Sequence, residues 1–293
     1  MTWQAIARKD FRDAVRSRWL WGLSAIFFGL FVGSAYLIGS GVQPQGNQPL
    51  TSEVFVPTLG NRVVALVVPI VAIVVAYSSV IGERESGSLK LLLSLPHSRQ
   101  DVVAGKTVGR STVLTLPVLV AMLLAAVVLA LYGVQVGPLK YLAFVALTLL
   151  LGVVFVSVAV GFSAAASSNR RAMLGTVGTY VVLTMLWTQV RRVLVVFNDK
   201  LGLGWENMTL VKYGLFIKFF NPIRAYESLV TRLYTDNVMA ARLYGAGRMQ
   251  GFIAQQIGEA PFYLSDWVVL AQFLLWLLVP VALGYLVFRD ADL

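Results

Sequence analysis

The residues best suited to chemistry gather in one short stretch, GERESGSLKLLLSLPHSR, at positions 82–99. It holds the paired carboxylates Glu83 and Glu85 and the only histidine, His97, between two long apolar runs. Paired carboxylates could act as general acid and base, or they could contact a partner. Three roles therefore need weighing for this stretch: catalysis, contact with a membrane or partner, and a plain loop.

Catalysis finds no support elsewhere in the chain. There is no cysteine, and a single histidine is a poor basis for zinc or haem ligation. The string Gly105-Lys106-Thr107 lacks the upstream glycine of a phosphate-binding loop, and the string around Ser163 lacks the final glycine of a nucleophile elbow. We predict a non-catalytic subunit that binds no metal and no cofactor, with its energy source in another chain.

The composition is that of an integral membrane protein. The 293 residues are 58% hydrophobic and 13% charged, with a mean hydropathy of +0.76, whereas soluble domains carry about 25% charged residues. The net charge of +10 would suggest nucleic acid in a soluble protein. In a membrane protein basic residues set the orientation instead, so we expect the lipid bilayer and no nucleic acid as partner.

Six uncharged apolar runs are long enough to cross a bilayer as helices, which requires about 20 residues each. They lie near 19–40, 63–82, 111–133, 141–166, 173–190 (extendable to 197) and 267–288. The sequence therefore predicts an all-α fold with six transmembrane helices.

Basic residues in the short segments between these runs are strongly asymmetric. One side holds Arg8, Lys9, Arg12, Arg16, Arg18, Arg84, Lys90, Arg99, Lys106, Arg110, Arg170, Arg171 and Arg289, and the other holds only Arg62 and Lys140. The side rich in lysine and arginine is normally cytoplasmic. We predict that both termini and residues 83–97 are cytoplasmic.

Residues 1–18 precede the first run and form an amphipathic pattern. Apolar residues recur at helical spacing, and charged residues occupy the other face. We predict an interfacial helix with its apolar face in lipid, a better interpretation than a simple basic flank. Its candidate contact residues are Trp3, Arg8, Lys9, Phe11 and Arg12.

Two spans carry features of a helix interface. In the first, Gly29 and Gly33 are spaced to let two membrane helices approach closely. In the fifth, one face holds Thr176, Tyr180, Thr184 and Thr188. This face could line a pathway or contact a partner subunit, or its hydroxyls could simply bond to their own helix, and the sequence does not choose between them.

Residues 198–265 precede the last span and are predicted to be extracytoplasmic. Asn221-Pro222 is a good helix start, because asparagine caps a helix and proline suits its first position. We predict one or two amphipathic helices here.

The opening stretch itself reads as a short helix between two bends. Gly87 permits the first bend, Ser88 can cap the helix, and Pro96 ends it. Ser98 followed by Asp101 is typical of a capping box that starts the next helix. Leucines 89, 92, 93 and 95 would give the short helix an apolar face.

These residues resemble the type 2 ATP-binding cassette (ABC) permeases, whose members commonly carry a Gly-Glu, Gly-[Ser/Thr]-Leu, Leu-Leu, Pro, [Ser/Thr]-Arg and Gly-Lys series here. The matching residues are Gly82, Glu83, Gly87, Ser88, Leu89, Leu92, Leu93, Pro96, Ser98, Arg99, Gly105 and Lys106. The opening ARKDFRDAVRSRWLW, Asn221-Pro222 and the closing FRDADL are similar to the family as well. Length and N-terminus look similar to the subgroup involved in nitrous oxide reductase maturation and copper processing.

The resemblance implies one transmembrane domain spanning 1–293, in the plasma membrane of a prokaryote. Two such permease subunits, identical or different, would associate with two separate ATPase subunits that bind ATP-Mg, and the complex would export its substrate. Residues 1–18 and a coupling helix at 83–97 would dock on the ATPases. The residues implied in coupling are Glu83, Glu85, Gly87, Leu89, Leu92, Leu93 and Pro96.

Two other functions stay open. A non-transporting membrane anchor or mechanotransmitter would need the same ATPase docking but no substrate path. A membrane-embedded lipid-modifying enzyme would need clustered aspartate or histidine at a membrane face, which this sequence lacks.

Overall fold

The computed structural model describes residues 3–41, 56–57, 59–94, 98–244, 247, 249–257 and 260–291. Within these ranges six helical stretches are long and apolar enough to cross a membrane. They are Leu20–Gly41, Ala65–Glu85, Arg99–Leu131, Pro138–Ala165, Asn169–Leu201 and Asp266–Arg289. The prediction of an all-α membrane protein with six spans is confirmed.

The N-terminal half begins with helix α1 (Trp3–Val15). The first span joins α2 (Arg18–Phe28), a π-helical turn η1 (Gly29–Gly33) and α3 (Ser34–Gly41). The second joins a π-helical turn η2 (Leu59–Val64), α5 (Ala65–Ala76) and α6 (Ile81–Glu85), and α7 (Ser88–Ser94) follows. The third and fourth spans are the unbroken helices α8 (Arg99–Leu131) and α9 (Pro138–Ala165).

The fifth span is segmented into α10 (Asn169–Val181), a π-helical turn η3 (Val182–Leu186), a short 3₁₀ turn η4 (Trp187–Gln189) and α11 (Val190–Leu201). Four shorter helices follow: α12 (Asn207–Lys218), α13 (Pro222–Arg232), α14 (Val238–Arg242) and α15 (Met249–Ile257). A 3₁₀ turn η5 (Phe262–Leu264) leads into the sixth span, α16 (Asp266–Arg289).

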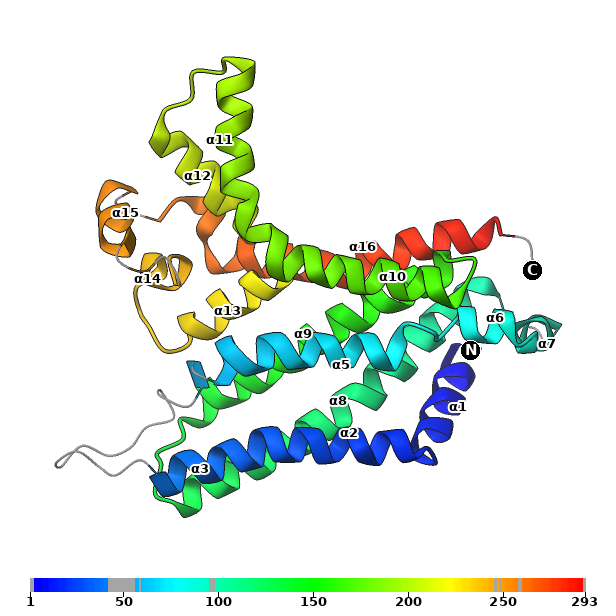
Figure 1. Cartoon of the computed structure of the whole chain (residues 1–293). Coiled ribbons are helices and arrows are strands. Elements are labelled where there is room, and N and C mark those ends of the chain that lie inside the picture. Colours follow the sequence, from blue (N-terminus) through cyan, green and yellow to red (C-terminus); the bar gives the residue numbers. More distant parts are fainter. Residues whose placement is uncertain are drawn as a thin grey trace.

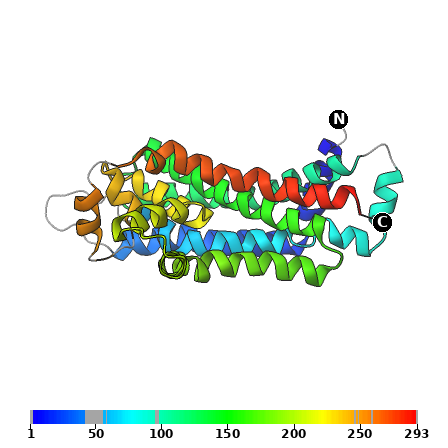
Figure 2. The ribbon, with the colours of Figure 1, turned by 90° about the horizontal axis from the view of Figure 1, so that it is seen from above.

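The helices form a long bundle, and both ends of the chain lie at one end of it (Figure 1). Helices α6 and α7 lie at that same end, while α14 and α15 lie at the other (Figures 1 and 2). Helix α11 turns away from the line of α10 and runs across the bundle direction (Figure 1).

The third span begins earlier than its hydropathy indicates. We predicted it from residue 111, but α8 starts at Arg99. The predicted capping box holds this start: the Ser98 hydroxyl accepts from the Asp101 N–H at 3.1 Å, and the Asp101 carboxylate accepts from the Ser98 N–H at 3.0 Å. The first turns of α8 are charged, so a hydropathy window does not include them.

The predicted outer segment holds more helix than expected. We predicted one or two helices in 198–265, whereas α12 to α15 and the end of α11 lie there. These helices are only 5–12 residues long, too short for a clear apolar period. The predicted start at Asn221 is confirmed, since its side chain accepts from the Ile223 N–H at 2.9 Å.

A buried arginine that sequence reasoning passed over ties this outer segment to the last span. The fully buried Arg242 guanidinium donates to the Leu264 carbonyl and to the Ser228 hydroxyl, each at 2.8 Å. It also pairs with Asp266 at the start of α16. The segment is therefore held by a satisfied charge as well as by apolar contacts.

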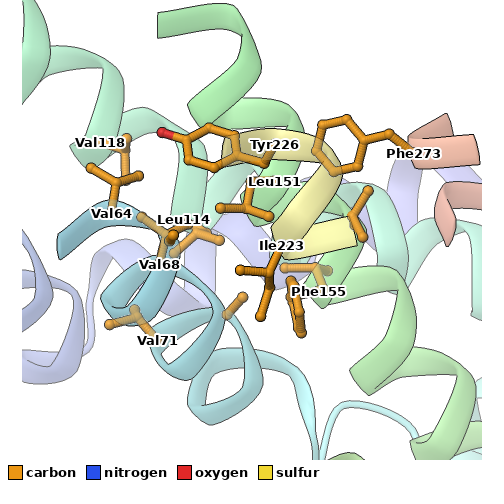
Figure 3. Packing of buried hydrophobic residues seen from close by; sticks show 14 of the residues in the cluster. Val64, Val68, Val71, Leu114, Val118, Leu151, Phe155, Ile223, Tyr226 and Phe273 are labelled. Atoms are coloured by element: carbon orange, nitrogen blue, oxygen red, sulfur yellow. The ribbon is translucent and has the colours of Figure 1, made fainter. Parts of the chain in front are cut away.

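The core is built around α9. It packs against α5, α8, α10, α13 and α16, and 67% of its most apolar stretch is buried, against 6% for the fifth span. Figure 3 shows Leu151 and Phe155 of α9 among side chains from α5, α8 and α13. Helix α13 reaches into this core, where the Tyr226 hydroxyl lies 3.1 Å from the Thr148 hydroxyl of α9.

Glycines allow α9 and α16 to cross at backbone contact. A Cβ atom at Gly161 would collide with the backbone of Pro280, and one at Gly284 would collide with the backbone of Gly161. Small residues at such crossings permit the van der Waals contact that joins membrane helices.

We predict that Gly161→Val destabilises the protein by about 1–3 kcal/mol, because the added side chain must push α16 away. Gly178→Val on α10 is the matched control, since a Cβ there would meet nothing within 4 Å. Thermal unfolding of the detergent-purified variants measures the difference. Equal melting temperatures for the two variants would contradict the close crossing.

Candidate functional site

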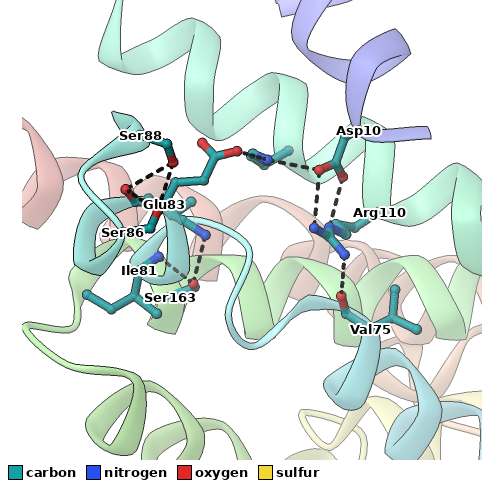
Figure 4. A network of polar contacts seen from close by, with 10 residues as sticks. Asp10, Val75, Ile81, Glu83, Ser86, Ser88, Arg110 and Ser163 are labelled. Carbon is teal, nitrogen blue, oxygen red and sulfur yellow. Dashed lines mark hydrogen bonds and ion pairs between the residues drawn. The ribbon is translucent and has the colours of Figure 1, made fainter. Parts of the chain in front are cut away.

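A buried ion network lies where α1, α6 and α8 meet (Figure 4). The Lys106 ammonium on α8 donates to Asp10 of α1 at 2.8 Å and to Glu83 of α6 at 2.6 Å. The side chains of Lys106 and Asp10 are only 6% and 5% exposed. A buried charge is tolerated only when it is paired, so this lysine requires both acids in place.

Arginine 110, one turn further along α8, completes the network. Its Nε atom pairs with the second Asp10 oxygen at 2.8 Å, and its Nη1 donates to the Val75 carbonyl at 3.1 Å near the end of α5. The two bases and the two acids, Asp10 and Glu83, carry no net charge together. One cluster thus joins α1, α5, α6 and α8.

Two glycines on α8 bring α1 close enough for these bonds. A Cβ atom at Gly105 would lie 2.7 Å from the Ile6 Cβ, and one at Gly109 would lie 2.9 Å from the Asp10 Cβ. Both approaches are closer than real side chains allow, so the spacing Gly105–Gly109 is a helix-contact motif around Lys106. The sequence signal was available, but it lies outside the apolar run.

The bend before α7 lies at Gly87 as predicted, but Ser88 is the first residue of α7 and its hydroxyl donates to a carbonyl instead of capping the helix. Gly87 has a φ of +74°, a conformation that favours glycine. The Ser86 and Ser88 hydroxyls donate to the Glu83 carbonyl at 3.2 and 3.3 Å. At the break between α5 and α6, the Ser163 hydroxyl of α9 accepts from the N–H groups of Val80 and Ile81 at 3.0 and 3.1 Å.

Two further contacts of the stretch fasten the same end of the bundle. The Glu85 carboxylate accepts from the backbone N–H and the side-chain amide of Asn169, at 2.8 and 2.6 Å, where α10 begins. Arg99 donates to the carbonyls of Phe288, Arg289 and Ala291 at the end of α16. The motif and the closing FRDA are therefore in direct contact.

The predicted coupling residues differ in how far they are available to a partner. Glu83 and Glu85 are engaged within the chain rather than free for a partner, and Leu89 is buried. Leu92 and Leu93 are half-buried against the core, whereas Leu91 is 73% exposed. Pro96, with Leu95 and His97, lies outside the described residues, so its role stays a prediction.

The N-terminal helix is formed as predicted, but part of its apolar face does not lie in lipid. Ile6 and Ala7 are buried against α8, because Gly105 and Gly109 open a seat for them. Trp3, Arg8, Lys9 and Arg12 are exposed and Phe11 is partly exposed. Periodicity identifies an apolar face, but it does not say whether protein or lipid covers it.

The predicted interface residues lie apart from the ion network. Gly29 and Gly33 are in η1, and a Cβ atom at either would meet nothing within 4 Å. The hydroxyls of Thr176, Thr184 and Thr188 donate to carbonyls of their own helix, at 2.7, 2.8 and 2.9 Å. The Tyr180 hydroxyl donates to the Leu66 carbonyl of α5 at 3.2 Å.

Among the described residues, no group of three or more His, Cys, Asp or Glu side chains could hold a metal ion. The ion network is neutral, largely buried and made of groups bonded to one another. It fastens α1, α5, α6 and α8 to one another.

The family model of the ABC-2 family transporter proteins matches residues 4–293, so the chain belongs to that family. It is a transmembrane permease subunit of an ABC transporter, which associates with an ABC ATPase. A relative from Stutzerimonas stutzeri, "Probable ABC transporter permease protein NosY", is 30% identical over 288 residues, covering 97% of this chain and 96% of the relative. A protein of the same name from Pseudomonas aeruginosa PAO1 is 31% identical over 186 residues, covering 62% and 66%.

We predict that Lys106→Met destabilises the protein by about 3 kcal/mol, because it leaves Glu83 without its cation and weakens the pairing of Asp10. Lys90→Met on α7 is the control, since Lys90 is exposed. Thermal unfolding and protease cleavage within α1 measure the effect. Adding Asp10→Asn and Glu83→Gln to Lys106→Met should recover part of the loss, and equal stability of the two single variants would contradict the network's role.

Proposed function

We propose that the chain forms half of the membrane pathway of an ABC exporter, with all of 1–293 acting as one transmembrane domain. A second permease subunit, identical or different, completes the pathway, and two separate ATPase subunits bind ATP-Mg. The permease is itself non-catalytic. The observation that carries the proposal is the Asp10–Lys106–Glu83 contact, since it joins the two proposed docking elements, α1 and α6–α7, to one transmembrane helix.

In this proposal the ATPase binds the exposed side of α7 and the polar face of α1. The closing of the ATPases on ATP displaces α7, and α6 is bonded to α7 through the Glu83 carbonyl and the serines of the bend. Glu83 then passes the displacement to Lys106 and so to α8, a helix of 33 residues. In this path the displacement passes through one short bend and one charge pair.

The end of the bundle that holds α1, α7 and the last turn of α16 is proposed to be cytoplasmic, in a prokaryotic plasma membrane. Its support is the thirteen basic residues of the short segments on that side, against two on the other. Helices α12, α14 and α15 would then be extracytoplasmic.

We predict that a tag at either terminus is inaccessible in sealed right-side-out vesicles and becomes accessible on permeabilisation. A cysteine introduced at Lys140, at the other end of the bundle, should label from outside without permeabilisation. Labelling of either terminus from outside would overturn the proposed orientation.

We predict that Leu91→Asp abolishes co-purification of the ATPase, because it puts a charge into the apolar part of the docking surface while leaving the fold intact. Leu91 is 73% exposed, so the charge itself is solvated in the free subunit. Leu139→Asp, an 82% exposed leucine at the other end of the bundle, is the control. Undiminished ATPase recruitment by Leu91→Asp would remove α7 from the docking site.

A second function is favoured by one observation. The hydroxyls of Thr176 in α10 and Thr184 in η3 are bonded to carbonyls of their own span, so they are not free polar groups of a substrate path. A subunit that passes the ATPase's movement to a partner across the membrane, without transport, needs only the ion network. Substrate-dependent ATPase activity and uptake into inverted vesicles support the exporter, whereas ATPase activity coupled to no transported solute supports the mechanotransmitter.

A further inference from the structure

A cavity of about 760 Å³ opens beneath α1, between α2, α5 and α8. Helices α2 and α5 both pack against α8, and the cavity lies between them. Its size is in the range of small-molecule sites in proteins. The described side chains that line it change from charged at the α1 end to wholly apolar along α2 and α5.

The charged end is balanced in sign. It is lined by three basic and three acidic side chains, Lys9, Lys106, Arg110, Asp10, Asp13 and Glu83. Lys9 and Asp13 are exposed at the rim, while Asp10 and Lys106 are buried. Glu83 gives one oxygen to Lys106, but its buried Oε2 has no hydrogen-bond partner among the described residues. That atom is itself buried, so Asp13 is the exposed acidic side chain at this end.

The apolar end is uncovered within the subunit. Ile26 on α2 is 54% exposed, and Ile70 and Val74 on α5 are 42% and 53% exposed. These residues belong to two candidate spans, so hydrocarbon rather than water is their natural contact. A ligand for the whole cavity must be apolar at one end and carry both signs of charge at the other.

We propose that this cavity binds one phospholipid with a zwitterionic ammonium headgroup, of the phosphatidylethanolamine class. An acyl chain lies between α2 and α5. The phosphate faces Lys9 and Arg110, and the ammonium faces Asp13. The lining favours this headgroup over an anionic one, because three basic and three acidic side chains match a headgroup that carries both signs of charge and no net charge. The inference does not depend on ATPase docking.

Such a lipid covers the side of the ion network that faces the cavity. It fills the space that separates α1 and α2 from α5. Its occupancy is thus expected to stabilise the seat of α1 on α8.

Native mass spectrometry of the full chain tests the proposal after delipidation and addition of dioleoyl phosphatidylethanolamine or phosphatidylglycerol. We expect one tightly retained phosphatidylethanolamine per subunit, and about tenfold weaker retention for Ile26→Trp, equivalent to about 1.4 kcal/mol. Phe28→Trp is the matched control, because Phe28 is a similarly exposed residue of α2 that does not line the cavity.

Two surface variants keep the test decisive if Ile26→Trp fails to fold. Lys9→Gln should weaken retention of phosphatidylethanolamine, whereas Arg8→Gln, its exposed neighbour on α1, should not. Asp13→Asn should reduce the preference for phosphatidylethanolamine over phosphatidylglycerol. Equal retention of the two lipids by the unmodified protein would overturn the proposal. A change in subunit association by Ile26→Trp with no retained lipid would also overturn it, and would assign the cavity to a second subunit.

Discussion

One buried ammonium group governs the arrangement of the helices near the chain ends. Lys106 lies on a helix that crosses the membrane, and water reaches only 6% of its side chain. A charge in such a place is strongly destabilising unless carboxylates neutralise it, so α1 and α6 must bring Asp10 and Glu83 to it. Gly105 and Gly109 make this pairing possible, because side chains at these positions would keep α1 away from α8. The position of α1 and the pairing of the Lys106 charge therefore depend on each other.

Helix α9 and the fifth span differ in how much of their surface the subunit buries. Helix α9 is largely buried within the subunit, whereas the fifth span leaves most of its surface outside it. Of the three π-helical turns in the described residues, Gly29–Gly33 and Val182–Leu186 lie in the two least buried spans, and Leu59–Val64 lies at the start of the second span. Wide turns of this kind accumulate at functional positions. The subunit therefore combines a dense middle with outer helices that have room to change shape.

Local sequence patterns were sufficient to predict the features that depend only on neighbouring residues. Apolar runs placed all six spans, and capping residues placed the starts at Ser98 and Asn221. The ion network could not be foreseen in the same way, because Lys106 and Asp10 are 96 positions apart and each looked like an ordinary charge of a cytoplasmic flank. The Gly-Lys-x-x-Gly string at 105–109 signals a close helix contact, but it does not say which helix makes that contact. The outer helices α12, α14 and α15 were not predicted for a different reason, since segments of five to twelve residues show too little of an apolar period.

The order of residues along the chain has a consequence for biosynthesis. Asp10 and Glu83 both precede Lys106, so both acidic residues leave the ribosome before the lysine that pairs with them. During that interval α1 has nothing to hold it against the bundle, and its carboxylate stays at the aqueous surface. Arrival of the third span in the membrane supplies the cation and the glycine seat together. This end of the subunit is thus expected to close only once the third of the six spans has been inserted.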